Sequence, residues 1–203
     1  MMLEPLEQRR VLSSWSGHLT QDTLWDDTTE PYVLAGDLYV DSDVTLTIAP
    51  DVQVETNNNS HEILVDGDLD ASQADFVGSA TDIRMRSGGR ADLVDCELPA
   101  GQILYHDGAS GTVDGTTGAY RLHAETDSVT VIDAWLGYAE IAADISITGS
   151  RLEYVTLSDG TPTVTGNTIT DAVPLRITDP DGQTNGFSGN TFEAAEPWIH
   201  VKG

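Results

Sequence analysis

The stretch Gly166-Asn167-Thr168-Ile169 returns further along the chain as Gly189-Asn190-Thr191-Phe192. Weaker copies of this turn with an apolar anchor stand upstream, and their anchors are Phe76, Leu98, Leu136 and Leu152. Successive anchors are 16 to 23 residues apart, except for one step of 38 that fits two repeats of 19. A repeat of about 20 residues is typical of a solenoid, in which each turn buries its apolar face only by stacking on its neighbours.

Short alternating segments lie between these anchors. We expect strands that open at Ile63, Ile83, Ile103, Tyr120, Ile141, Val155 and Leu175. Their first and third residues are mostly apolar and their second and fourth are mostly polar, so that one pair faces inward and the other outward. The many Gly, Thr, Val and Asp residues favour strands joined by tight turns. The sequence therefore predicts an all-β, single-domain solenoid in which Asn167 stacks on Asn190.

The first half of the chain contains a recognisable sequence motif. Gly36-Asp37 is followed by Val44-Thr45-Leu46-Thr47-Ile48-Ala49-Pro50-Asp51-Val52, and Ile63-Leu64-Val65-Asp66-Gly67 continues it. With the Gly-Asn-Thr turns, these residues resemble bacterial right-handed parallel β-helix proteins, the pectate-lyase-like solenoids, over nearly the whole chain after residue 14. The resemblance implies a right-handed parallel β-helix. It implies little about activity, because this fold hosts many functions.

The N-terminal residues 3–13, Leu-Glu-Pro-Leu-Glu-Gln-Arg-Arg-Val-Leu-Ser, lack the apolar core of a signal peptide. They resemble the planctomycete-type N-terminal motif of exported and surface proteins, which implies an extracellular or cell-surface location. The same residues also fit a short amphipathic helix that caps the open end of the solenoid. The two interpretations are compatible.

The repeat gives the expected organisation of the chain. Residues 1–13 form the N-terminal motif or capping helix, 14–60 a lead-in segment with the first turns, and 61–203 the remaining turns. Pro197-Trp198-Ile199-His200 opens a further turn with no capping segment after it. We expect either a fragment of a longer solenoid or an end that meets another chain and allows an oligomer to form.

The composition excludes some partners. The chain contains 34 Asp and Glu residues but only 9 Lys and Arg residues, which gives a net charge of −25. Such a charge repels nucleic acid and anionic membranes, and no apolar run reaches the length of about 20 residues that spans a bilayer. We expect neither nucleic acid binding nor membrane insertion. The single cysteine, Cys96, excludes an intrachain disulfide and occupies the repeat position of Ala134 and Ser150.

The basic residues suggest a binding site. Arg84, Arg86, Arg121 and Arg176 take outward positions in the expected strands, and His106 and His123 are assigned to the column of Arg86. Arginine binds carboxylates and sulfates through two parallel hydrogen bonds. We therefore expect these six residues to form a stripe that binds an anionic polysaccharide. The alternative is that the arginines neutralise acidic neighbours such as Asp82, Asp107 and Asp144.

Other chemistry has less support. Polysaccharide lyases and hydrolases of this fold place paired carboxylates on the outer sheet, and we find no such pair beside the stripe, so we expect no catalytic residues. The turn at residues 179–186 is acidic but departs from a calcium loop in its Pro180 and in having no closing Glu. We expect a solvated turn, with no metal site and no cofactor; the acidic composition suits salty or calcium-containing surroundings, and calcium is the alternative. The tryptophans, Trp15, Trp25, Trp135 and Trp198, are far apart in the sequence, and we expect them to pack in caps and loops rather than to form a platform on which sugars stack.

These observations favour a non-catalytic extracellular or cell-surface scaffold or adhesion module. Its expected partners are an anionic polysaccharide, bound along the Arg/His stripe, or other surface proteins. The alternative function is a polysaccharide lyase or glycoside hydrolase of the β-helix type.

Overall fold

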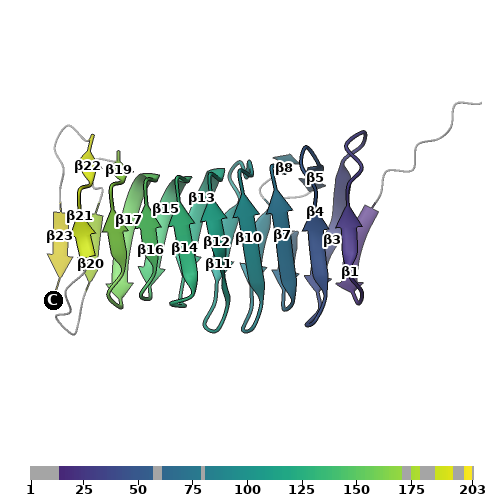
Figure 1. Ribbon diagram of the computed structural model, residues 1–203, viewed down its shortest axis with the longest axis horizontal. Helices are drawn as coiled ribbons and strands as arrows, with labels where there is room; N and C mark the ends of the chain where they lie inside the picture. Colours follow the sequence, from purple (N-terminus) through teal and green to yellow (C-terminus); the bar gives the residue numbers. More distant parts are fainter. Residues whose placement is uncertain are drawn as a thin grey trace, which may run out of the picture.

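The computed structural model describes residues 14–56, 61–78, 81–170, 175–178, 186–193 and 199–202. Within these ranges the chain forms strands, turns and bends and no helix. All named strand pairs are parallel, and each strand lies beside the equivalent strand one turn away. Figure 1 shows the strands stacked side by side along the long axis, in chain order. The prediction of a parallel β-solenoid is confirmed, whereas the N-terminal motif and capping helix lie outside the described residues.

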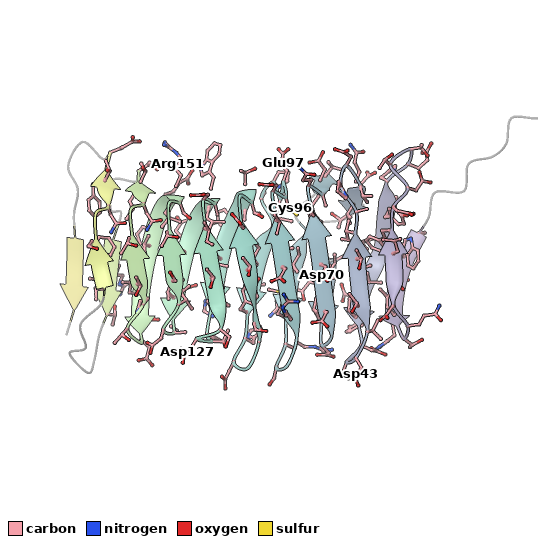
Figure 2. The ribbon with its side chains drawn as sticks, viewed as in Figure 1. Asp43, Asp70, Cys96, Glu97, Asp127 and Arg151 are labelled. Atoms are coloured by element: carbon pink, nitrogen blue, oxygen red, sulfur yellow. The ribbon has the colours of Figure 1, made fainter. Side chains whose placement is uncertain are left out.

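One side of the solenoid is a nine-stranded sheet with one strand from each turn, which we call side B. Its strands are β2 (Thr23–Trp25), β4 (Thr45–Ile48), β7 (Asp68–Ser72), β10 (Arg90–Val94), β12 (Ser110–Asp114), β14 (Val129–Ile132), β16 (Ser146–Thr148), β18 (Thr163–Thr165) and β21 (Gly186–Ser188). Figure 2 shows this sheet from the front, with Asp70 on its outer surface and Asp43 and Asp127 in turns along one edge.

The other strands form a fourteen-stranded sheet. They are β1 (Ser14–Leu19), β3 (Tyr32–Val40), β5 (Gln53–Thr56), β6 (Glu62–Val65), β8 (Asp75–Gly78), β9 (Asp82–Met85), β11 (Gln102–Tyr105), β13 (Thr117–Ala124), β15 (Trp135–Ala142), β17 (Arg151–Asp159), β19 (Thr168–Ile169), β20 (Leu175–Thr178), β22 (Thr191–Phe192) and β23 (Ile199–Lys202). The segment expected to lead into the solenoid thus already supplies β1 to β5, which belong to the same two sheets.

This second sheet covers two sides of the solenoid because its long strands bend. The first residues of β17 pair with β19, and its residues Val155–Leu157 pair with β20. We call the side that contains β6, β9, β11, β20, β23 and the second halves of β1, β3, β13, β15 and β17 side A. The side that contains β5, β8, β19, β22 and the first halves of the same long strands is side C.

The apolar anchors of the repeat form one column in the core. Leu136 pairs with Ala119 before it and with Leu152 after it, and the column continues through Ile169 to Phe192. Ala119 is the anchor of the turn that the 38-residue step passes over, so the prediction of two turns there is confirmed. Side chains from all three sides are buried against this column, as expected for a solenoid whose turns have no other core.

A second inward column lies beside the turn that precedes side C. It contains Cys96, Thr116, Ala134, Ser150 and Asn167, all buried. The Asn167 amide nitrogen donates to Asn190 Oδ1 at 3.1 Å and to the Ile147 carbonyl at 3.0 Å, while Asn167 Oδ1 accepts from the Ser150 backbone at 2.8 Å. The predicted Asn167–Asn190 stack is therefore confirmed, and these amides tie three successive turns together.

The corner between sides C and A breaks the alternation of inward and outward residues. In β15, Leu136 and Ala139 are buried, while Gly137 and Tyr138 between them lie at the surface. The same spacing separates the buried residues of β13 and β17 at this corner. Two neighbouring surface positions therefore occur at each turn, because the strand changes direction there.

This corner explains an error in the predicted register. Ile103 pairs with Leu122, and Leu122 pairs with Ala139. The strands expected to open at Tyr120 and Ile141 are therefore displaced by two residues, and Tyr120 is exposed instead of facing inward. The displacement arises because a strict two-residue alternation was carried through the bend.

Candidate functional site

All six residues expected to form the basic stripe are on side A or in the turn that follows it. Arg84 lies in β9, Arg121 and His123 in β13, Arg176 in β20, and Arg86 and His106 in turns after β9 and β11. The columns differ from the expected ones, because His123 pairs with Leu104 and Leu104 with Arg84. His123 therefore belongs to the column of Arg84, and only His106 lies in the column of Arg86.

Most of these cations are already paired with carboxylates from a neighbouring turn. Arg84 donates two hydrogen bonds to Glu62, from Nη2 to Oε1 at 2.9 Å and from Nε to Oε2 at 3.1 Å. On the same side, Arg86 forms an ion pair with Asp66, and Arg121 forms one with Glu140. These acids are not the neighbours named from the sequence, but the interactions neutralise the arginines as the alternative interpretation predicted. Side A carries alternating charges and not a run of unpaired cations.

Two histidines share one carboxylate. His106 Nδ1 and His123 Nε2 lie 2.9 Å from the two oxygens of Glu125. Arg84 Nη1 lies 3.3 Å from His106 Nε2. Because a guanidinium can only donate, Nε2 is the acceptor, and Nδ1 carries the proton that His106 donates to Glu125. The network from Arg84 through His106 and Glu125 to His123 joins three turns of the solenoid.

The pKa shifts of the acids near this network have opposite signs. Hydrogen bonds from His123 and His106 lower the pKa of Glu125 from its ordinary value of 4.5. Burial raises the pKa of Asp82, although its carboxylate accepts hydrogen bonds from the backbone and the side chain of Gln102. Glu125 therefore stabilises the fold when ionised, whereas Asp82 favours the folded state more strongly as the pH falls.

The Glu125 interaction predicts a stability loss in acid. Because its pKa is lowered by folding, its contribution is complete above about pH 4.5 and disappears as the pH falls through the folded-state value. Glu125→Gln should cost up to about 1 kcal/mol at pH 6.5, since the carboxylate is partly exposed, and less at pH 3, where the carboxylate is protonated to a greater extent. Urea denaturation at the two pH values measures this difference. The control is Glu97→Gln, an exposed acid on side C (Figure 2); a deficit for Glu125→Gln that is as large at pH 3 as at pH 6.5 would contradict the assignment.

The surface feature that the sequence did not reveal is a ladder of tyrosines at the corner of sides A and C. The ring centroids of Tyr120 and Tyr138 are 5.3 Å apart, and those of Tyr138 and Tyr154 are 5.4 Å apart. Tyr138 pairs directly with Tyr154 in neighbouring strands. The spacing of 18 and 16 residues between these tyrosines is close to the repeat and is the signal that could have identified them.

The tyrosine ladder borders a hollow of about 400 Å³ on side A, which we call the tyrosine hollow. Its lining residues are Gln102, Tyr120, Arg121, Tyr138, Ala139, Glu140, Tyr154, Thr156 and Arg176. Aromatic faces thus stand beside amide, hydroxyl and charged groups, which is the combination expected of a small-molecule or sugar site.

Arg176 differs from the other arginines of side A. Its side chain is exposed, and within the part of the chain that the structure describes it makes no ion pair. Its guanidinium therefore remains able to bind an external carboxylate or sulfate. Of the six predicted residues, Arg121 and Arg176 are the two that line the tyrosine hollow.

The tryptophans divide into two groups. Trp15 and Trp25 pack against each other and Tyr32 at the first turn, with ring centroids 5.3 Å and 4.7 Å apart for the Trp15–Trp25 and Trp25–Tyr32 pairs. This packing agrees with the expectation for these two residues. Trp135 is instead 50 % exposed on the outer surface of side C, so the expectation was wrong for it. Trp198 lies outside the described residues.

Other kinds of chemistry find little support among the described residues. Cys96 is buried, and burial raises the pKa of its thiol, which disfavours the thiolate that a nucleophile requires. Residues 14–56, 61–78, 81–170 and the shorter described ranges contain no group of three His, Cys, Asp or Glu side chains arranged to bind a metal ion. The acidic turn considered for calcium lies outside these ranges, except for Gly186 at its end. None of the described segments is a helix with the length and apolarity to cross a bilayer.

The chain was compared with protein families, curated proteins and solved structures. Neither the protein-family models nor the curated proteins nor the solved structures contain a match to this chain.

Proposed function

We propose that this protein is a non-catalytic extracellular or cell-surface scaffold that binds polysaccharide at the tyrosine hollow. The observation that carries the proposal is the clustering of exposed aromatic side chains. Four large hydrophobic side chains are exposed among the described residues, and three of them, Tyr120, Trp135 and Tyr138, lie on two consecutive turns at one corner. Exposed apolar groups that gather in this way mark a binding surface.

A sugar chain fits this surface better than an apolar ligand does. A pyranose ring has apolar faces that can lie on the tyrosine rings and hydroxyl groups at its edge that can bond to Gln102 and Thr156. The turns of a parallel solenoid are about 4.8 Å apart, which is close to the length of one sugar unit. The ladder can therefore meet successive units of one chain.

Arg176 supports a preference for acidic sugars. The overall charge of −25 repels a polyanion at long range, so an acidic chain needs a direct contact with an unpaired cation. Arg176 provides that contact at the end of the hollow. The acidic composition and the N-terminal motif support the location outside the cell.

Calorimetric titration with defined hexasaccharides tests this function. The probes are oligogalacturonate, which is acidic throughout, the hexasaccharide of hyaluronan, which alternates acidic and neutral units, and neutral cellohexaose. We expect the two acidic probes to bind more tightly than cellohexaose. Tyr138→Ala should weaken their binding at least about tenfold, or about 1.4 kcal/mol, which is the scale of one aromatic contact. Arg176→Gln should remove the preference for acidic probes.

The matched control is Tyr39→Ala, which removes a tyrosine of side A that stacks on His18, away from the hollow. Binding should survive this change. A parent protein that binds none of the probes, or equal losses for Tyr39→Ala and Tyr138→Ala, would refute the proposed site. Release of new reducing ends or unsaturated products from any probe would refute the non-catalytic role in favour of a lyase or hydrolase.

A further inference from the structure

A second hollow lies on the other side of Tyr120. It has a volume of about 300 Å³ and is lined by Ala100, Gly118, Ala119, Tyr120, Trp135, Gly137 and Glu153. We call it the tryptophan hollow. Tyr120 also lines the tyrosine hollow, so that both hollows share this residue. The two hollows are therefore neighbours around the corner from side A to side C.

Two glycines leave the floor of the tryptophan hollow open. Gly118 has a φ of +82°, which side chains rarely adopt, and a Cβ on Gly137 would lie 2.6 Å from the Tyr120 carbonyl oxygen. Both positions therefore require glycine for steric reasons. The consequence for the surface is that a ligand can approach the bare backbone between two aromatic side chains.

The walls combine apolar and acidic groups. Tyr120 and Trp135 are 54 % and 50 % exposed. Glu153 is exposed as well, and no hydrogen bond or ion pair joins its carboxylate to another described residue. No cation belongs to the lining residues: the neighbouring Arg151, which pairs with Trp135 across the strands, binds Glu193 at 3.4 Å. The hollow thus offers aromatic faces and a carboxylate that accepts hydrogen bonds.

We propose that the tryptophan hollow is a second sugar subsite that takes an uncharged pyranose unit of the chain held in the tyrosine hollow. The indole of Trp135 and the ring of Tyr120 pack against the faces of the sugar, and Glu153 accepts hydrogen bonds from its hydroxyl groups. The same carboxylate repels a uronate or sulfated unit, since no cation of the hollow compensates it. This inference rests on the proposed function and adds that the bound polysaccharide places a neutral unit next to an acidic one.

The two hollows favour ligand units of different charge. The tyrosine hollow presents Arg176, whereas the tryptophan hollow presents Glu153. A chain that alternates acidic and neutral units can satisfy both, and a fully acidic chain can occupy only the first. Arg176 on one side of the corner and Glu153 on the other therefore together select a polysaccharide in which acidic and neutral units alternate.

The test is titration of the parent protein and its variants with the hyaluronan hexasaccharide and with oligogalacturonate. Trp135→Ala should weaken binding of the alternating hexasaccharide about tenfold and leave oligogalacturonate unchanged. Tyr138→Ala should weaken both. Glu153→Gln should strengthen oligogalacturonate binding, because the repulsion of the second uronate is removed. Leu24→Ala is the control, since Leu24 is the remaining exposed large hydrophobic residue among those described and lies in β2 on side B.

The outcomes separate the two proposals. If Trp135→Ala changes the affinity for neither probe, or weakens the binding of both equally, the second subsite is refuted. The proposed site at the tyrosine hollow is not affected by that result. A parent protein that binds neither probe overturns the proposed function and the subsite with it. Far-UV circular dichroism and a thermal melt of Trp135→Ala test whether the solenoid is intact. If Trp135→Ala does not fold, the test rests on Glu153→Gln. Binding of oligogalacturonate by Glu153→Gln that is no tighter than binding by the parent would also overturn the subsite.

Discussion

Replacing Leu136 with alanine is expected to lower the free energy of unfolding by about 2–5 kcal/mol. Leu136 is fully buried in the central column, between Ala119 and Leu152 of the neighbouring turns. Its strand is hydrogen-bonded on both sides, so the backbone cannot move inward to fill the space. The loss therefore includes both the transfer of the side chain from the core and the cavity that remains. It is a large part of the roughly 5–15 kcal/mol that stabilises an ordinary domain.

Urea denaturation followed by far-UV circular dichroism measures this effect at neutral pH. Leu24→Ala is the matched control, because the same side chain is removed from the surface, and it should change the stability by less than about 0.5 kcal/mol. Equal stability of the two variants would contradict the stacking of Leu136 within the column.

Replacing Asn167 with alanine is expected to cost about 2–4 kcal/mol. The change leaves the buried Ser150 backbone amide and the Ile147 carbonyl without the partners that Asn167 provides, and each such group costs about 1–3 kcal/mol. Asn190 would also lose its contact with the Asn167 amide. Because the amide joins neighbouring turns, the loss should lower the cooperativity of unfolding as well as its midpoint.

The neighbouring turn supplies a graded test of this prediction. Ser150 occupies the equivalent position, and its hydroxyl accepts a hydrogen bond from the Ala134 backbone at 3.1 Å. Asn167→Ser can reproduce that bond to the turn before it, and it should therefore recover part of the stability. Thr168→Ala, at the next position along β19, controls for a general effect on the turn. Thermal unfolding should rank Asn167→Ala below Asn167→Ser and both below Thr168→Ala; no difference between the first two would contradict the role of the side-chain ladder.

The core of the fold was predictable from the sequence because it is one-dimensional. Each turn repeats the same inward positions. The regular spacing of Leu152, Ile169 and Phe192 in the sequence therefore predicts that their side chains stack on one another. The Asn167–Asn190 pair was predictable for the same reason. Parallel strands convert a period in the sequence directly into a column in space.

The corner could not be predicted in the same way. A two-residue alternation assigns Tyr120 to the core, but the bend of β13 places Tyr120 and Arg121 at the surface one after the other. The positions of Tyr138 and Tyr154 depend on the same geometry. The alternation therefore assigned Tyr120 to the core and did not identify Tyr138 and Tyr154 as surface residues.

The basic stripe shows a different limit. The sequence correctly places Arg84, Arg86 and Arg121 at the surface, yet it does not show which carboxylates lie one turn away. With Glu62, Asp66 and Glu140 as their partners, these arginines became part of a neutralised network. The candidate site lies instead at the aromatic corner, where Arg176 makes no ion pair with another described residue.

The six tyrosines of the chain provide the most direct test of this account. With ¹³C-labelled tyrosine rings, each assigned through its phenylalanine variant, the hyaluronan hexasaccharide should shift the NMR signals of Tyr120, Tyr138 and Tyr154. Tyr32 and Tyr105 are buried, and Tyr39 stacks on His18, so their signals should stay in place. A titration that shifts none of the three corner tyrosines, or that shifts Tyr39 instead, would contradict a sugar site at the corner of the solenoid.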